Sequence, residues 1–125
     1  MSTKNLEASV RHQPRVAIVD LHGEIDAFAE DVLNTAYAEA ESRGTDVIML
    51  NFSDVNYINS TGIALIVSLL ARARKAKRRL LACGLSDHYV EIFQITRLVD
   101  FMSVFPDEAS ALSENPKSII TPREK

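Results

Sequence analysis

Three short apolar runs, separated by longer stretches with helical spacing, constrain the fold of this chain more than any other feature. They cover residues 16–19, 47–50 and 80–83, and polar or glycine residues border them. Runs this short are typical of strands buried on both faces of a parallel sheet, because a buried helix needs a longer segment. Strands that alternate with helices predict an α/β protein whose sheet is mostly parallel and covered by helices.

Helical patterns fill the segments between these runs. Asp26 is a candidate N-cap for a helix in which apolar side chains recur from Ala29 to Ala40, and Gly44 ends that helix. A second helix begins near Ser60 and ends in basic residues, which suits the negative end of the helix dipole. The remaining elements are helices over 86–95 and 106–112, a strand over 101–105 and an edge strand over 6–11.

These elements amount to a single domain over residues 1–125, with a sheet of four to five strands and about four helices. Apolar residues make up 46% of the chain and charged residues 25%, as in an ordinary globular domain. We expect order from about residue 6 to 112. The segment 113–125 holds two prolines and little core material, so it is predicted to be a flexible tail.

Charge and cysteine content argue against several classes of protein. The net charge of −3 disfavours direct nucleic-acid binding, because such domains are usually strongly basic. The single cysteine, Cys83, lies in an apolar run, which predicts a buried thiol rather than a disulfide or a zinc site. No apolar run approaches the ~20 residues that span a bilayer, and the chain starts without a signal core. We therefore expect a cytoplasmic protein that does not contact membranes.

The stretch from Val55 to Ile63 carries the clearest functional signals. A strand ends, a polar turn follows and a long apolar helix begins, so Asn59, Ser60 and Thr61 lie beside the unpaired N–H groups of a helix start. A phosphate on Ser60 would meet those N–H groups and the positive helix end, and it would add about −1.5 to −2 charge. Ser60 is therefore a candidate phosphorylation site. The alternative is that Ser60 only caps the helix.

Helical geometry divides the second helix into two apolar faces. One face, at about 100° per residue, consists of Ile63, Ile66, Val67 and Leu70. We expect this face to pack on the sheet. Leu65 and Leu69 lie nearly opposite, beside Gly62 and Arg72, and two exposed leucines next to a modifiable hydroxyl indicate a docking surface. Alternatively, another element of the fold covers both leucines.

Two motifs resemble those of the anti-sigma factor antagonists of bacteria, which are single-domain members of the STAS fold. The first is Gly23-Glu24-Ile25-Asp26 before a helix, and the second is Asn59-Ser60-Thr61-Gly62-Ile63 after a strand. Residues 84–86 and 92–98 also look like this family. The resemblance covers about residues 6–112, and it implies the STAS fold. This resemblance rests on the order and spacing of the motifs more than on any single motif.

The resemblance implies regulation by partner switching. In that family, the unphosphorylated antagonist binds an anti-sigma factor that is also a serine kinase, and a sigma factor is released. The kinase then uses ATP to phosphorylate the antagonist, which dissociates, and a separate PP2C-type phosphatase resets it. The acceptor maps onto Ser60, with Thr61 as the second choice. The expected partner-binding residues are Asp26, Asn59, Thr61, Gly62, Leu65 and Leu69.

Two of these positions match residues of the family, and one departs from its pattern. Asp26 matches an aspartate that lies near the acceptor in the family, and Gly62 matches the motif glycine, which we expect to let the kinase approach closely. Asn59 departs from the pattern, because the family usually has aspartate there. Asparagine still caps a helix, but it carries no charge. The missing carboxylate would weaken recognition by the kinase or relieve repulsion of the phosphate.

Other candidate chemistry is weaker. The basic cluster consists of Arg72, Arg74, Lys75, Lys77, Arg78 and Arg79. It suits a helix C-terminus and a solvated loop, although an acidic partner or nucleic acid is the alternative. His12, His22 and His88 lack metal-ligand spacing, and no P-loop, dinucleotide or nucleophile motif is present. We therefore expect no catalytic residues, metal or cofactor.

Three hypotheses about function follow. The leading one is a non-enzymatic anti-sigma factor antagonist controlled at Ser60, present as a monomer or a weak homodimer. The second is a constitutive STAS module that binds or scaffolds proteins without a phosphorylation cycle, which Asn59 favours. The third, a small enzyme such as a nucleotide hydrolase, has no motif in its support.

Overall fold

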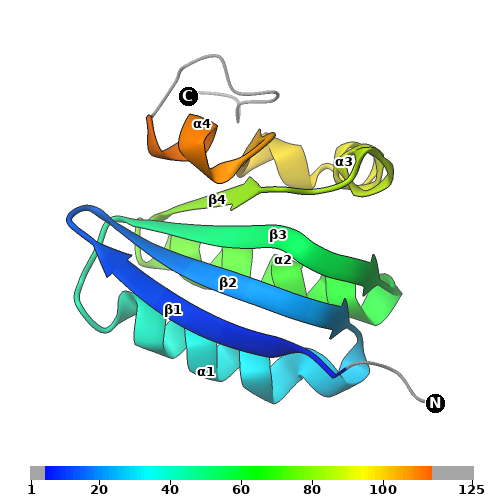
Figure 1. The fold of residues 1–125 in the computed structure, drawn as a ribbon, viewed down its shortest axis with the longest axis horizontal. Helices are drawn as coiled ribbons and strands as arrows, with labels where there is room; N and C mark the ends of the chain where they lie inside the picture. Colours follow the sequence, from blue (N-terminus) through cyan, green and yellow to red (C-terminus); the bar gives the residue numbers. More distant parts are fainter. Residues whose placement is uncertain (1–4, 114–125) are drawn as a thin grey trace.

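The computed structural model describes residues 5–113, which form a five-stranded sheet with helices on both sides (Figure 1). The strands lie in the order β1-β2-β3-β4-β5. Their bounds are β1 (Glu7–Gln13), β2 (Val16–Ile25), β3 (Val47–Ile58), β4 (Arg79–Cys83) and β5 (Ser103–Phe105). β1 pairs with β2 in the antiparallel sense and the other three pairings are parallel, so the predicted α/β architecture and its edge strand are confirmed.

Helices follow the strands in the predicted order. They are η1 (Ala27–Ala29), α1 (Glu30–Glu41), α2 (Ser60–Lys75), α3 (Asp87–Ile95), η2 (Leu98–Asp100) and α4 (Glu108–Leu112), where η marks a 3₁₀ helix. The predicted tail over 113–125 falls outside the described residues except for Ser113. No helix within residues 5–113 is long and apolar enough to cross a membrane.

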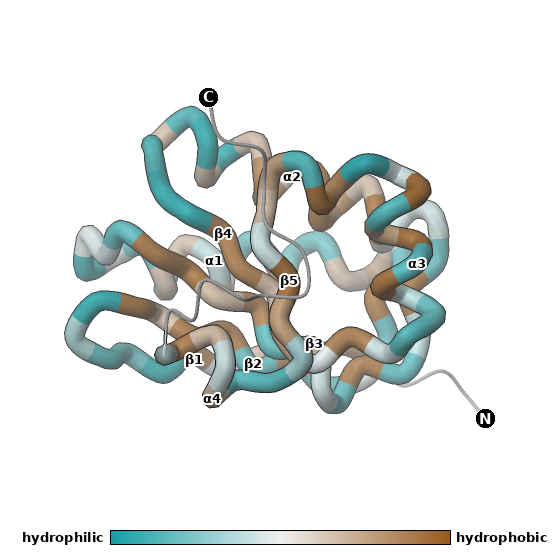
Figure 2. The backbone as a smooth tube through the Cα atoms, turned by 90° about the horizontal axis from the view of Figure 1, so that it is seen from above, coloured by the Kyte–Doolittle hydropathy of each residue, from teal (hydrophilic) through white to brown (hydrophobic). Residues whose placement is uncertain are grey.

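The core lies in two layers, one on each face of the sheet. The larger layer joins the sheet to α1, α2 and α3, and Phe52 meets Phe93 there in an edge-to-face contact. The smaller layer lies under α4 and includes Ile18, Met49 and Cys83. Seen from above, the hydrophobic segments concentrate along the strands, whereas the peripheral loops are hydrophilic (Figure 2).

Two strands are longer than their apolar runs predict. β2 continues through Gly23 to Ile25, and β3 continues to Ile58, where a polar turn was expected. The physical reason is the short partner strand: β4 pairs with β3 only as far as Asn51. Beyond that point β3 is flanked on one side only, so polar residues are tolerated in a strand that remains paired with β2.

A polar network fixes α4 on the sheet. The Arg11 guanidinium donates to both carboxylate oxygens of Asp20 at 2.6 and 2.9 Å, and also to Glu108 on α4. Asn51 donates to the same Asp20 carboxylate at 2.8 Å. The Arg11 contact holds the pKa of Asp20 below its ordinary value. On this face of the sheet, ion pairs therefore add to the apolar packing under α4.

Candidate functional site

Helix α2 begins at the carboxyl end of β3, and Asn59 caps it. The Asn59 side-chain oxygen accepts from the Gly62 N–H at 2.8 Å, and the Asn59 carbonyl accepts from the Ile63 N–H at 2.9 Å. Ser60 is thus the first helical residue and not the cap. Its hydroxyl makes no hydrogen bond within residues 5–113, and both Ser60 and Thr61 are exposed. The alternative reading of Ser60 as a structural cap is therefore wrong.

Gly62 lies at a point of close contact between α2 and the end of β2. A Cβ atom at this position would lie 2.1 Å from the Ile25 carbonyl oxygen, which already accepts from the Asn59 N–H at 3.2 Å. Gly62 is buried. The missing side chain of Gly62 therefore lets α2 approach β2, and the expectation that it also lets a kinase approach stays a prediction.

Asp26 follows directly after this contact and caps η1. Its carboxylate accepts from the Phe28 N–H at 2.9 Å, and its carbonyl accepts from the Ala29 N–H at 3.0 Å. Asp26 is thus an N-cap, but of η1 and not of the predicted helix: α1 follows Ala29, which provides no side-chain cap. η1 contacts α2. Ile25 and Ile58 are register partners at the ends of β2 and β3, so the loops carrying Asp26 and Ser60 leave the same edge of the sheet.

The buried face of α2 differs from the predicted one. Leu69 is 1% exposed and lies in the core, and Leu65 is half-buried against it, so the expected pair of exposed leucines is not on the surface. Val67, expected to face the sheet, is 45% exposed. The reason is that α2 packs on α1 as well as on the sheet, so the buried face of the helix extends to Leu69. The alternative that another element covers the leucines is correct.

Tyr89 on α3 contributes a contact that the sequence did not suggest. Its hydroxyl accepts from the Ile58 N–H at 3.0 Å, where β3 has passed the end of β4. Ser86 caps α3, accepting from the Tyr89 N–H at 3.4 Å. α3 therefore fixes the end of β3, two residues before Ser60. A tyrosine at the start of a helix gives no sequence signal for such a contact.

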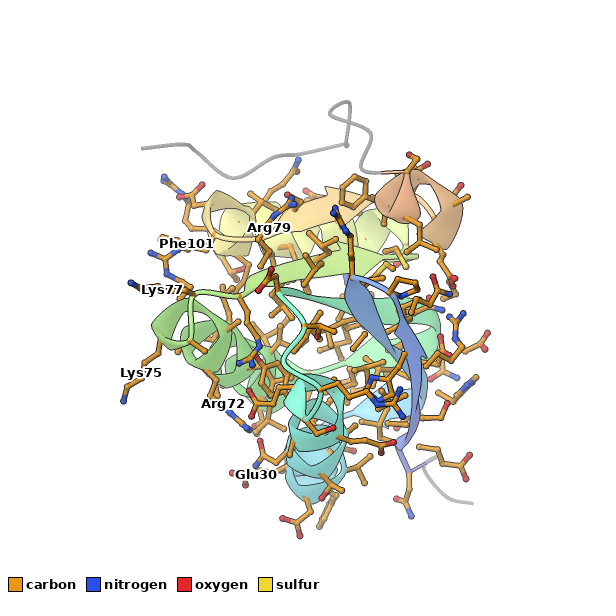
Figure 3. All side chains as sticks on the ribbon, turned by 90° about the vertical axis from the view of Figure 1, so that its left-hand side faces the viewer. Glu30, Arg72, Lys75, Lys77, Arg79 and Phe101 are labelled. Atoms are coloured by element: carbon orange, nitrogen blue, oxygen red, sulfur yellow. The ribbon has the colours of Figure 1, made fainter. Side chains whose placement is uncertain are left out.

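The two ends of α2 differ in charge. Arg72 and Arg78 are paired with Glu41 on α1 at 2.9 and 3.2 Å, and the Arg74 guanidinium lies 4.7 Å from the Phe101 ring centroid. Figure 3 shows this C-terminal end, with Lys75 and Lys77 projecting from it. In contrast, residues 44–71 and 16–42 contain no Lys or Arg. The far end of α2 is therefore basic, whereas the end that carries Ser60 has neither a basic nor an acidic side chain in its first turn.

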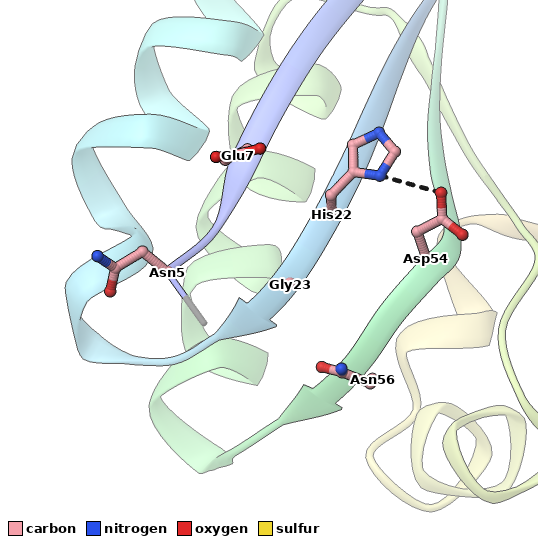
Figure 4. A pocket seen from close by; sticks show the side chains of 6 residues that line it. All are labelled: Asn5, Glu7, His22, Gly23, Asp54 and Asn56. Carbon is pink, nitrogen blue, oxygen red and sulfur yellow. Dashed lines mark ion pairs between the residues drawn. The ribbon is translucent and has the colours of Figure 1, made fainter. Parts of the chain in front are cut away.

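A polar pocket lies on the outer face of β1, β2 and β3, away from α2. Its lining residues are Asn5, Glu7, His22, Gly23, Asp54 and Asn56 (Figure 4). The His22 Nδ1 atom lies 2.9 Å from an Asp54 carboxylate oxygen. Within residues 5–113, no three His, Cys, Asp or Glu side chains are grouped so that they could hold a metal ion. The pocket includes none of the predicted site residues.

Comparison with known proteins places this arrangement in a family. The sequence model of the STAS domain matches residues 7–111. This chain belongs to the STAS domain family. The resemblance seen in the two sequence motifs is thereby confirmed at the level of the family.

Relatives of this STAS domain have regulatory names. The anti-sigma-B factor antagonist of Staphylococcus aureus is 31% identical over 100 residues, which cover 80% of this chain and 93% of the relative. An anti-sigma factor antagonist from Mycobacterium paratuberculosis superimposes with a TM-score of 0.76 at 17% identity, covering 88% and 93% of the two chains. The Bacillus cell fate determinant SpoIIAA in its phosphorylated form superimposes with a TM-score of 0.66 at 20% identity, covering 86% and 97%.

The one cysteine of this STAS domain lies where its thiol is poorly reactive. Cys83 is fully buried at the end of β4, as predicted. Desolvation raises the pKa of its thiol to about 12, and the carboxylate of Glu108 adds to the effect. The thiolate, which is the reactive form, is therefore scarce at neutral pH.

The capping of α2 by Asn59 in this STAS domain can be tested by substitution. Asn59→Ala removes the cap of α2 and is expected to lower the free energy of unfolding by about 1 kcal/mol, whereas Asn59→Asp retains the acceptor and is expected to cost nothing. Urea unfolding of the two variants and the parent gives the comparison. Equal losses in both variants would contradict a capping role and indicate that the amide N–H₂ matters instead.

Proposed function

We propose that this STAS domain is an anti-sigma factor antagonist that acts by partner switching. It binds an anti-sigma factor serine kinase while Ser60 is unmodified, and phosphorylation of Ser60 releases it. The names of its relatives support the first part of this proposal, and the geometry of Ser60 supports the second.

The observation that carries the proposal is the position of the Ser60 hydroxyl. It is exposed at the first turn of α2, and Asn59 alone supplies the side-chain cap. A kinase can therefore add a phosphate without removing any structural hydrogen bond. The neighbouring N–H groups of Ser60 and Thr61 have no partner within the helix, and they and the helix dipole favour a negative group.

The chemistry is a phosphoryl transfer catalysed by the partner. The Ser60 Oγ atom attacks the γ-phosphorus of ATP, the bond to the bridging oxygen of ADP breaks, and the hydroxyl proton passes to a base of the kinase. Phosphoserine and ADP then face each other across the interface. Their negative charges repel in a site from which water is largely excluded, which drives the two proteins apart.

A phosphatase completes the cycle. Phosphoserine at the first residue of α2 would project from an exposed helix end, and no side chain within residues 5–113 covers it. A PP2C-type enzyme can therefore reach the phosphate once the kinase has left. Hydrolysis restores the hydroxyl and the binding-competent state.

The test is a phosphorylation assay with the purified protein. Each anti-sigma factor of the cell of origin is incubated with it and MgATP, and intact mass followed by peptide mapping locates any phosphate. We expect one phosphate on Ser60 of the parent and none on Ser60→Ala. Phosphate on Thr61 instead would move the switch by one residue, and no transfer from any of these factors would contradict it.

A constitutive binding module is the second candidate, and Asn59 favours it. A carboxylate usually occupies this position in the family, and the structure shows that the asparagine satisfies the cap without supplying charge. In that case the same surface binds its partner permanently. Protein isolated from its own cells under changing conditions would then carry no phosphate on either hydroxyl.

A further inference from the structure

An exposed aromatic side chain lies on η1, the short helix that contacts α2. Among the large apolar residues within 5–113, Phe28 is the most exposed, at 87%. It belongs to η1, which contacts α2. Tyr57, 46% exposed, lies at the end of β3, three residues before Ser60. Two exposed aromatic residues therefore lie on the elements next to α2, one on η1 and one at the end of β3.

The Phe28 ring is exposed although its backbone is held firmly. Asp26 accepts from the Phe28 N–H through its carboxylate and from the Ala29 N–H through its carbonyl. Ala29 is 1% exposed and anchors η1 in the core. A ring on a fixed backbone loses little conformational freedom when a partner covers it, and this lowers the cost of binding.

The surroundings of Phe28 define the chemistry of the partner. Asp26, Glu30 and Asp31 lie within five residues of the ring, and no ion pair within residues 5–113 neutralises them. Residues 16–42 contain no Lys or Arg. The complementary surface is an apolar pocket bordered by basic side chains, because aromatic anchors need a desolvated pocket and acidic rims attract cations.

We propose that Phe28 is the anchor through which the anti-sigma factor is bound, inserting into an apolar pocket with a basic rim on that protein. This inference rests on the proposed function and adds to it. Asp26 is then a positioning residue that fixes η1, and Ser60 modifies a contact whose strength comes from the neighbouring ring. Anchors of this kind account for most of the binding energy in interfaces where a few residues dominate.

The chain provides a matched control for the test. Phe101 is also exposed, at 47%, but it stacks with Arg74 at the opposite end of α2. Phe28→Ala, Phe28→Leu, Phe101→Ala and the parent are titrated against the anti-sigma factor that forms the complex, by calorimetry. We expect Phe28→Ala to weaken binding at least about 20-fold and Phe28→Leu to weaken it clearly less. The affinity of Phe101→Ala is expected to lie within about 2-fold of that of the parent.

Each other result contradicts the inference in a distinguishable way. If Phe28→Ala binds like the parent while a negative charge at Ser60 still abolishes binding, the anchor is wrong and the switch stands. Equal losses in the Phe28 and Phe101 variants would indicate unspecific apolar contact. If the parent binds no anti-sigma factor, the proposed function fails and the anchor with it. Melting temperatures of the variants, expected within about 2 °C of the parent, exclude unfolding as a cause.

Discussion

Replacing Ser60 with glutamate is expected to weaken binding of the anti-sigma factor at least about 100-fold, which corresponds to about 2.7 kcal/mol. Ser60 would lie inside the contact and not at the proposed basic rim around Phe28, and a charge buried in an interface without a matching partner costs about 2–5 kcal/mol. Calorimetric titration of the parent, Ser60→Ala and Ser60→Glu measures the effect. Ser60→Ala is expected to bind like the parent, because the hydroxyl makes no hydrogen bond within residues 5–113.

The Ser60→Glu variant is expected to be as stable as the parent. A carboxylate in the first turn of α2 favours the positive helix end by about 0.3–1 kcal/mol, and the Asn59 cap is untouched. Thermal unfolding of Ser60→Glu should therefore match that of the parent or lie slightly higher. A variant that both unfolds earlier and binds more weakly would show that the charge disrupts the fold, and the switch would lose its physical basis. Binding as tight as that of the parent would reject it outright.

Replacing Gly62 with alanine is expected to give the largest loss of stability at the site. The added Cβ would lie 2.1 Å from the Ile25 oxygen and 2.8 Å from the Ile25 carbonyl carbon. Both are backbone atoms, so α2 or the end of β2 must move. Such overpacking costs about 1–3 kcal/mol, here near the upper limit because backbone atoms must move, and the better helix propensity of alanine returns about 1 kcal/mol. We expect a net loss of about 2 kcal/mol, or roughly 8 °C in melting temperature.

Gly44→Ala is the control for this prediction. An alanine Cβ at Gly44 meets nothing within 4 Å, but the positive φ of 71° strains the backbone. We expect a loss of about 1 kcal/mol there, from the backbone alone. Urea unfolding measures both variants. A Gly62→Ala variant that is as stable as the parent would contradict the close contact, and the glycine of the acceptor motif would need another explanation.

The sequence predicted the fold because local patterns and tertiary structure agree in most elements. The run at 80–83 becomes β4 and the helical spacing before Gly44 becomes α1. The caps Asp26 and Asn59 both accept the backbone N–H groups that their residue types predict. These are signals within a few residues, which a single sequence contains in full.

The surface of α2 could not be predicted in the same way. Between Gly62 and Leu70 apolar residues occupy most positions, so periodicity does not distinguish a helix packed on a sheet alone from one also packed on α1. Leu69 is buried by this second contact and Val67 is exposed. The hydrogen bond from the Ile58 N–H to the Tyr89 hydroxyl likewise depends on where β4 ends. Contacts of this kind join residues far apart in the chain.

The unequal distribution of charge along α2 gives the whole molecule an orientation in an electric field. Its basic side chains make the Arg74 end positive, whereas the first turn at the Ser60 end carries no charged side chain, so the side-chain charge opposes the dipole of the α2 backbone. Near a positively charged protein surface, at separations up to about the 8 Å screening length, this arrangement exerts a torque. The domain would turn so that Ser60 arrives first, which raises the fraction of collisions that are productive. That advantage should fade with added salt.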